Sequence, residues 1–165
     1  MGGKKQHYRS RIRASWSRFG LLNATIKLMP PELGTETILV VDDEIAVLSL
    51  TTMMLSRYGY AVITAASTKE ALHLFEVWPD LHIDLLLVDI IMPELNGIEL
   101  AERIRQLRPD LPVLYFSAYS DQEPLRPVFS RRLPYIAKPF TSLQLTKRVR
   151  EVLDKPESTK AASEG

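Results

Sequence analysis

Short apolar runs alternate with segments of helical spacing through most of the chain. The runs predict strands at Thr37–Val41, Ala61–Ala65, Leu85–Val88, Pro112–Phe116 and Pro134–Ala137. Segments in which apolar residues recur every three or four positions predict helices over Ile45–Tyr58, Thr68–Val77, Ile98–Leu107 and Ser142–Leu153. Residues 121–132 have weaker helical spacing, and Pro124 and Pro127 predict a short or broken helix there.

The strands are almost continuously apolar, as is expected of strands buried on both faces of a parallel sheet. Their alternation with helices predicts the α/β class, with a doubly wound five-stranded parallel sheet and helices on both faces. Right-handed crossover connections leave a few possible strand orders, and the pattern does not choose among them.

The first predicted helix has an inward face of six residues and a stop signal behind it. The inward residues are Val47, Leu48, Thr51, Met54, Leu55 and Tyr58. Gly59 follows, as glycine often does past the end of a helix. We also interpret Met53 as a core or turn residue.

Polar side chains follow four of the predicted strands at the point where each strand ends. The first strand runs into Asp42, Asp43 and Glu44, and the third ends on Asp89. The fourth ends on Ser117 and the fifth on Lys138. In open parallel sheets the carboxyl ends of the strands lie at one edge, where ligands bind. Carboxylates, a hydroxyl and an amine at this edge indicate a site for a phosphoryl group and a metal ion.

Each of these residues also has an ordinary structural explanation. Acids before a helix are favoured by the helix dipole, and a single aspartate at a strand end often caps a helix. Ser117 could form a turn, and Lys138 could be a solvated surface residue. Their coincidence at one edge favours a functional site.

Four segments closely resemble the receiver domain of two-component response regulators, the CheY-like family. The matching segments are Ile38–Glu44, Leu86–Gly97, Leu114–Ala118 and Tyr135–Phe140. The resemblance covers residues 36–153 and implies a flavodoxin-like strand order of 2-1-3-4-5. It also implies a signalling domain rather than an enzyme.

The resemblance assigns a role to each acid of the edge. Asp89 would accept a phosphoryl group from a histidine kinase, a phosphotransfer protein or a small acyl phosphate. Clustered carboxylates repel one another and call for a cation, and Mg²⁺ suits a site of few carboxylates with water and phosphoryl oxygens. By resemblance, Asp43 and Asp89 bind Mg²⁺ directly, Ile91 offers its backbone carbonyl, and Asp42 acts through a water molecule.

The remaining site residues would stabilise and report the phosphoryl group. Lys138 would pair with phosphoryl oxygens, aimed inward by a cis peptide before Pro139. Ser117 and Tyr135 resemble the family's switch, in which the hydroxyl moves toward the phosphoryl group and the ring turns inward. Tyr135 could instead be a core aromatic residue. The output protein is left open, and a phosphorylation-dependent homodimer is possible.

Two positions near the predicted site depart from many relatives. Ile91 and Tyr119 stand where some relatives have acids or amides that orient water, which predicts a long-lived phosphorylated form. Ile91 also argues against the alternative that Asp89 is the nucleophile of a metal-dependent phosphohydrolase, since such enzymes usually have a second aspartate there.

Composition and charge divide the chain into three parts. Its 165 residues contain no cysteine, which excludes disulfides and cysteine-based zinc sites. No apolar run predicts a membrane span or a secretory signal, so we expect a cytoplasmic location. We expect a disordered basic extension over residues 1–34, a receiver domain over 35–155 and a disordered tail over 156–165.

The extension suggests a second alternative function. Residues 1–30 contain seven Lys and Arg residues and no Asp or Glu. The extension could therefore bind nucleic acid or lie on a membrane surface, whereas no nucleic-acid binding is expected from the receiver domain itself. The sequence is consistent with a single-domain regulator or with a receiver cut from a larger signalling protein.

Overall fold

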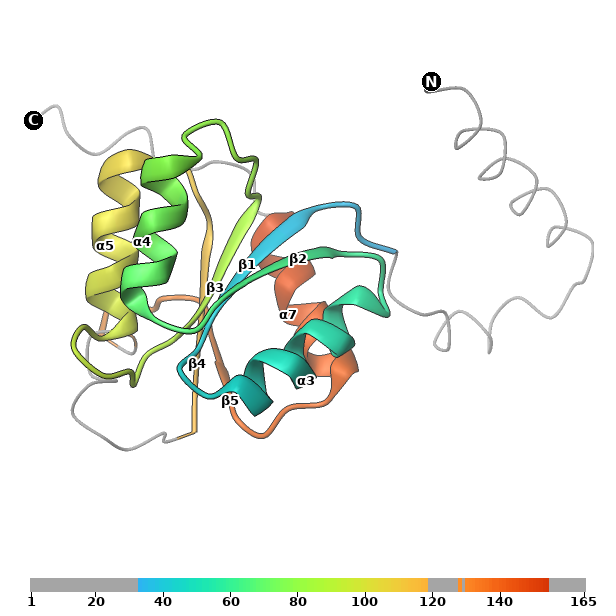
Figure 1. Cartoon of the computed structure of the whole chain (residues 1–165). Coiled ribbons are helices and arrows are strands. Elements are labelled where there is room, and N and C mark those ends of the chain that lie inside the picture. The colour runs from blue at the N-terminus through green and yellow to red at the C-terminus, as the bar shows by residue number, and fades with distance from the viewer. Residues whose placement is uncertain (1–32, 119–127, 129, 155–165) are drawn as a thin grey trace, which may run out of the picture. The chain divides into compact units, whose positions relative to one another are not determined.

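Five parallel strands form one sheet in the computed structural model, which describes residues 33–118, 128 and 130–154. The strands are β1 (Thr37–Val41), β2 (Ala61–Ala65), β3 (Leu85–Asp89), β4 (Val113–Ser117) and β5 (Tyr135–Ala137). Their order across the sheet is β2-β1-β3-β4-β5 (Figure 1). The predicted fold class and strand order are confirmed.

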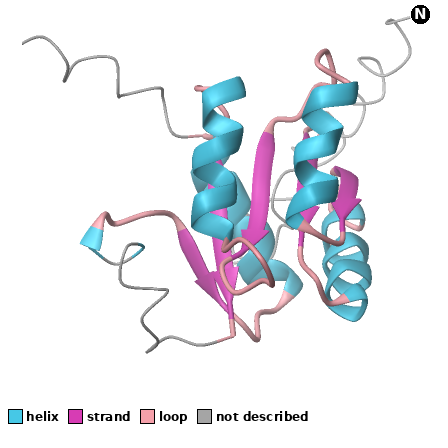
Figure 2. Cartoon of the chain, turned by 60° about the vertical axis from the view of Figure 1, so that its left-hand side comes forward, coloured by secondary structure: helices cyan, strands magenta, loops and turns pink. Residues whose placement is uncertain are grey.

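Among the described residues, two helices cover each face of the sheet (Figures 1 and 2). The helices are α3 (Ile45–Ser56), α4 (Thr68–Val77), α5 (Gly97–Leu107) and α7 (Ser142–Leu153). Residues of α4 and α5 belong to one buried cluster, and residues of α3 and α7 belong to the other. The sheet is thus buried on both sides, as its apolar strands predict.

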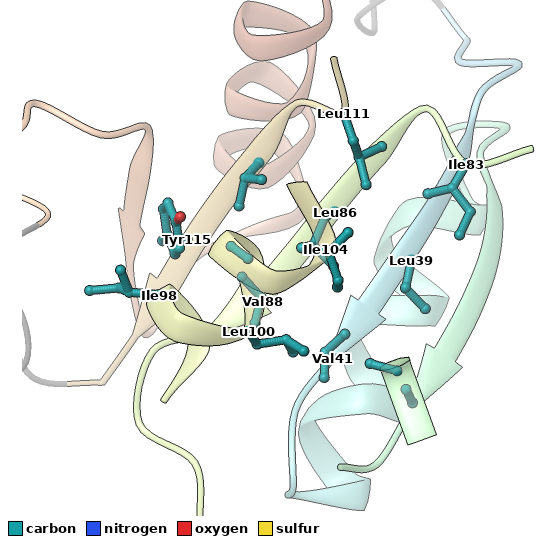
Figure 3. Close-up of a cluster of buried hydrophobic side chains, with 14 of the residues drawn as sticks. Leu39, Val41, Ile83, Leu86, Val88, Ile98, Leu100, Ile104, Leu111 and Tyr115 are labelled. Carbon is teal, nitrogen blue, oxygen red and sulfur yellow. The ribbon is translucent and has the colours of Figure 1, made fainter. Parts of the chain in front are cut away.

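Successive residues of the central strands enter opposite cores. Leu39, Val41, Leu86 and Val88 face α4 and α5 (Figure 3), whereas Ile38, Val40, Leu85 and Leu87 face α3 and α7. Side chains alternate across a strand, so a strand covered on both faces needs apolar residues at every position. This explains the absence of polar alternation in the sequence.

Most strand and helix bounds agree with the predictions to within one residue. The prolines predicted to open β4 and β5 lie just outside these strands. Proline has no backbone N–H to donate to a neighbouring strand. Both nevertheless accept through their carbonyls: Leu86 N–H donates to Pro112 and Tyr115 N–H donates to Pro134.

The first helix ends two residues earlier than predicted, at Ser56. Gly59 then turns the chain with a φ of +91°, a conformation that glycine adopts without steric cost. Three of the predicted inward residues, Leu48, Thr51 and Leu55, are buried. The interpretation of Met53 as a core or turn residue is wrong, because it lies within α3 and its side chain is 62% exposed.

Several predictions fall outside the described residues. They are the basic extension up to residue 32, Tyr119, the tail from residue 155, and most of the weak helix over 121–132. Gly34 is described, and its N–H donates to the Tyr58 carbonyl at 2.7 Å, so the chain contacts the domain from this point. None of the described helices is long and apolar enough to cross a membrane.

Candidate phosphoacceptor site

The predicted site residues lie at or just past the carboxyl ends of four adjacent strands. Asp42 follows β1, Asp89 ends β3, Ser117 ends β4 and Lys138 follows β5. The ends of β3, β4 and β5 are level with one another: Asp89 of β3 pairs with Phe116 of β4, and Ser117 of β4 pairs with Ala137 of β5. Parallel pairing therefore places these four strand ends at one edge of the sheet.

The Lys138 ammonium joins two carboxylates at the centre of this edge. Lys138 Nζ lies 2.7 Å from Asp42 Oδ2 and 2.5 Å from Asp89 Oδ2. Asp42 is fully buried, Asp89 is 6% exposed, and the Lys138 side chain is 12% exposed. One largely buried cation thus compensates two buried anions.

Each carboxylate is also held by a backbone N–H. Glu44 N–H donates to Asp42 Oδ1 at 2.8 Å, and Ile91 N–H donates to Asp89 Oδ1 at 3.0 Å. Both donors lie two residues beyond the acceptor, as in the Asx turns that aspartate forms with its own backbone. The loops after β1 and β3 therefore orient both carboxylates with their other oxygen toward Lys138.

Burial and ion pairing have opposite effects on the pKa values of Asp89 and Lys138. Burial raises the pKa of Asp89, and this outweighs the lowering effect of the hydrogen bond from Lys138. Burial lowers the pKa of Lys138, but its hydrogen bonds with Asp42 and Asp89 outweigh burial, so its pKa is raised overall. Lys138 has two anionic partners where Asp89 has one cation, which explains why the balance differs between them.

Backbone and aromatic contacts fix the position of Lys138. Its N–H donates to the Ser117 carbonyl at 2.8 Å, and the peptide between Lys138 and Pro139 is cis, as the resemblance implies. Its ammonium lies 4.4 Å from the centroid of the Phe116 ring, which Phe140 contacts edge-on at 6.1 Å. A cation over an aromatic face is attracted by the ring quadrupole. Sequence reasoning gave neither phenylalanine a role, although both lie in the matching segments.

The remaining predicted metal ligands lie at the rim of the site. Asp43 is exposed beside the buried Asp42, and the Ile91 side chain is 36% exposed. Within the part of the chain that the structure describes, no three acidic or histidine side chains converge into a ready metal site. Lys138 contacts the two buried carboxylates directly. The oxygen donors are still of the type that Mg²⁺ prefers.

The two predicted switch residues lie on the face of the sheet that α5 covers. Ser117 is fully buried, and its Oγ has no hydrogen-bond partner among the described residues. The Tyr135 hydroxyl oxygen is buried, and its ring packs against the core beneath α5. Burial, and then the negative charge of Asp89, raise the pKa of Tyr135. Tyr135 thus lies within electrostatic range of Asp89.

The comparison with known protein families agrees with this arrangement. The profile of the response regulator receiver domain matches residues 38–150, which is more than half of the chain. The chain therefore belongs to the response regulator receiver domain family, the signalling domains of two-component systems. Receiver domains interact with a histidine kinase or a phosphotransfer partner, and domains of this kind generally bind Mg²⁺.

Particular relatives place the domain in different protein contexts. The chain is 36% identical to the alkaline phosphatase synthesis transcriptional regulatory protein PhoP of Bacillus subtilis. The match covers 77% of this chain and 52% of PhoP. It is 34% identical to the sensor kinase CckA of Brucella abortus over 74% of its length and 13% of that protein. The chain thus spans about half or less of these relatives.

Among solved structures, the chain resembles a putative response regulator from Chloroflexus aurantiacus. The two are 34% identical with a TM-score of 0.64, and the match covers 74% of this chain and all of the other. The resemblance thus extends over the whole of that chain.

Proposed function

We propose that Asp89 is the phosphoacceptor of this receiver domain. The observation that carries the proposal is the pair of contacts to its carboxylate, one from Lys138 and one from the Ile91 N–H. These contacts orient a buried nucleophile beside a cation that can neutralise a transferring phosphoryl group. The donor would be a phosphohistidine of a histidine kinase or phosphotransfer protein, or a small acyl phosphate.

The transfer would exchange one bond to phosphorus for another. An Asp89 carboxylate oxygen attacks phosphorus, the new P–O bond forms, and the P–N bond to the donor histidine breaks. The bonding electron pair leaves with the imidazole nitrogen. Lys138, which contacts Asp89 Oδ2 and Asp42 Oδ2, follows the negative charge onto the phosphoryl oxygens while retaining the contact with Asp42.

The acids at the site support a requirement for Mg²⁺. Asp43 and Asp89 would bind it with their carboxylates, Ile91 with its carbonyl, and Asp42 through water. A bound Mg²⁺ neutralises charge on the phosphoryl oxygens and orients them. A related structure is a CheX–CheY complex with BeF₃ and magnesium from Borrelia burgdorferi, which is 26% identical to this chain with a TM-score of 0.64.

Phosphorylation would then act through Ser117 and Tyr135. The buried Ser117 hydroxyl has no partner among the described residues and would gain one in a phosphoryl oxygen. A hydrogen bond to a charged group contributes about 1.5–3 kcal/mol. Two such bonds, from Ser117 and Lys138, approach the roughly 5.5 kcal/mol that reverses a two-state equilibrium from 1:99 to 99:1.

Mass spectrometry after incubation with acetyl phosphate and Mg²⁺ tests the proposal. The full chain should gain one phosphoryl group, and Asp89→Asn should gain none. Asp84→Asn is a matched control, because this aspartate lies at the opposite end of β3 and accepts a hydrogen bond from Thr37 N–H. Undiminished labelling of Asp89→Asn would refute the assignment.

The metal requirement has its own test. Mg²⁺ should raise the melting temperature of the parent protein, since a ligand that binds only the folded state stabilises it by mass action. Asp43→Ala should abolish this shift and most of the labelling. A variant that responds to Mg²⁺ as the parent does would show that the metal binds elsewhere.

A further inference from the structure

The ring of Phe116 lies beside both the proposed nucleophile and the ammonium of Lys138. In the sheet, Phe116 of β4 pairs directly with Asp89 of β3. Leu87 and Leu114, two residues earlier on these strands, belong to the cluster packed against α3 and α7. Because side chains alternate along a strand, Asp89 and Phe116 point to this same face. The ammonium that contacts Asp89 therefore also lies over the neighbouring ring, 4.4 Å from its centroid.

The contact between Lys138 and this ring is largely shielded from water. Phe116 is fully buried, and the Lys138 side chain is 12% exposed. Phe140 contacts the Phe116 ring edge-on, with the ring planes at 80°, and so helps to fix its orientation. A cation over an aromatic face is attracted more strongly when the pair is desolvated. The ring therefore holds the ammonium more firmly than an aliphatic side chain in its place would.

The ring and the carboxylates hold Lys138 by different forces. Asp42 and Asp89 attract the ammonium through their negative charge, and both acids belong to the proposed phosphoryl and Mg²⁺ site. When their charge is shared with a metal ion and a phosphoryl group, their net attraction for Lys138 falls. The attraction of the ring comes from its quadrupole, which the acids do not share. Phe116 thus keeps its hold on Lys138 when the acids weaken theirs.

We propose that Phe116 is a positioning residue for phosphoryl transfer, because it keeps the Lys138 ammonium at the site while the acids bind the incoming group. This role rests on Asp89 being the phosphoacceptor, and Phe116 acts through Lys138 rather than on the phosphoryl group itself. Without the ring, the ammonium would turn toward solvent and the transferring charge would lose a fixed cation. Loading of Asp89 should then slow, whereas Mg²⁺ binding should not weaken, since a like charge would have moved away.

Initial rates of labelling by excess acetyl phosphate with Mg²⁺ test this role. Phe116→Leu should be labelled about 5–30-fold more slowly, which corresponds to a buried cation–π attraction of about 1–2 kcal/mol. Its affinity for Mg²⁺, measured by titration calorimetry, should be unchanged or higher. Leu114→Val is the matched control, because Leu114 is fully buried in the same cluster and on the same strand. This control should be labelled at the parent rate.

Fluorinated phenylalanines at position 116 separate the electrostatic effect from packing. Each fluorine withdraws electrons from the face of the ring and weakens its attraction for a cation, while the ring keeps nearly the same volume. The labelling rate should therefore fall stepwise through mono-, di- and trifluorinated phenylalanine. A ring that only filled the core would give the same rate throughout the series. Circular dichroism checks that each variant is folded.

The position of the ammonium also has a readout that does not depend on phosphorylation. The ε-methylene protons of Lys138, next to Nζ, lie near the face of the Phe116 ring. Their NMR signal should be shifted upfield by the ring current, with and without Mg²⁺. In Phe116→Leu it should return to the position typical of exposed lysines.

The outcomes distinguish this role from the proposed function. A parent protein that is not labelled on Asp89 would overturn the proposed function, and the role of Phe116 with it. A labelled parent would overturn the role of Phe116 alone in any of three cases. These are a rate insensitive to fluorination, equal slowing in Leu114→Val and Phe116→Leu, and an ε-methylene signal without an upfield shift. Weaker Mg²⁺ binding in Phe116→Leu would do the same, because it would indicate general damage to the site.

Discussion

Gly97 lies directly against the backbone of Asp89. A Cβ atom at position 97 would lie 2.8 Å from the Asp89 carbonyl carbon and closer still to its oxygen. The Gly97 N–H also donates to the Ile90 carbonyl at 3.0 Å. The first residue of α5 therefore packs against the strand that ends on the proposed nucleophile, and a side chain there would have to displace that backbone.

Gly97→Ala is accordingly expected to disturb both fold and site. The forced shift should lower the free energy of unfolding by about 1–3 kcal/mol and should reduce labelling of Asp89 by acetyl phosphate. Denaturant unfolding and mass spectrometry measure the two effects. Glu99→Ala, at an exposed position in the first turn of the same helix, should change neither by a comparable amount. Parent-like behaviour of Gly97→Ala would contradict the close approach.

Replacing Lys138 by Met should destabilise the protein in the absence of Mg²⁺. It leaves the buried Asp42 and Asp89 carboxylates without a cation, and breaking a buried ion pair in this way costs about 3–5 kcal/mol. Adding Asp42→Asn should recover part of the loss, because one of the two unpaired charges is then removed. Lys147→Met, at an exposed position in α7, is the control. If the losses of unfolding free energy from Lys138→Met and Asp42→Asn simply added in the double variant, the expected interaction between the two residues would be contradicted.

Removing the Ser117 hydroxyl should stabilise the unmodified protein. The Oγ is buried without a partner among the described residues, and such a group costs about 1–3 kcal/mol. Ser117→Ala should therefore raise the melting temperature but weaken the response to phosphorylation. Thr146→Val, in contrast, should lower the melting temperature, because it removes the hydrogen bond that Thr146 Oγ1 donates to the Ser142 carbonyl at 2.9 Å. A lower melting temperature for Ser117→Ala would contradict the interpretation.

The ion pair between Glu36 and Arg150 predicts a pH dependence of stability. The hydrogen bond from Arg150, at 2.7 Å, holds the pKa of Glu36 below its ordinary value of 4.5. A lowered folded-state pKa stabilises the fold above the unfolded-state pKa, and this contribution is lost as the pH falls through the folded-state value. Glu36→Gln should thus be less stable than the parent by about 0.5–1 kcal/mol at neutral pH, with the difference vanishing in acid.

Urea unfolding at several pH values measures this dependence. Glu102→Gln is a suitable control, because its partner Arg131 is 58% exposed and Glu102 itself is 50% exposed. Exposed pairs contribute little, so this variant should stay within about 0.5 kcal/mol of the parent. A stability difference for Glu36→Gln that persisted unchanged in acid would exclude the ion pair as its cause.

The apolar Ile91 side chain predicts slow loss of the phosphoryl group. Hydrolysis needs a water molecule aligned for attack, and this half-exposed side chain offers nothing to orient it. Ile91→Asn should speed decay after removal of acetyl phosphate without changing how Asp89 is loaded. Adding Tyr119→Glu, at a position outside the described residues, should extend the effect. Unchanged or slower decay in the double variant would refute this explanation.

The sequence alone predicted the described helices and strands and the edge of the sheet at which the candidate site residues gather. The bounds of β1, β2, α4 and α7 agree with the predictions residue for residue. Apolar runs specify strands because both faces of the sheet are buried, and parallel strands end at one edge whatever their order. The sequence could therefore bring Asp42, Asp89, Ser117 and Lys138 to one edge, while the strand order came from the family resemblance.

Only the tertiary structure decided which of these groups touch. Lys138 lies 96 residues from Asp42 and 49 from Asp89 along the chain, and their contact depends on the pairing of the four adjacent strands β1, β3, β4 and β5. The exposure of Met53 and the close approach of Gly97 to Asp89 were likewise unpredicted. The local spacing of apolar residues indicates which side of a helix or strand is apolar. Which side chains touch, and which remain exposed, depends on neighbours that are distant in sequence.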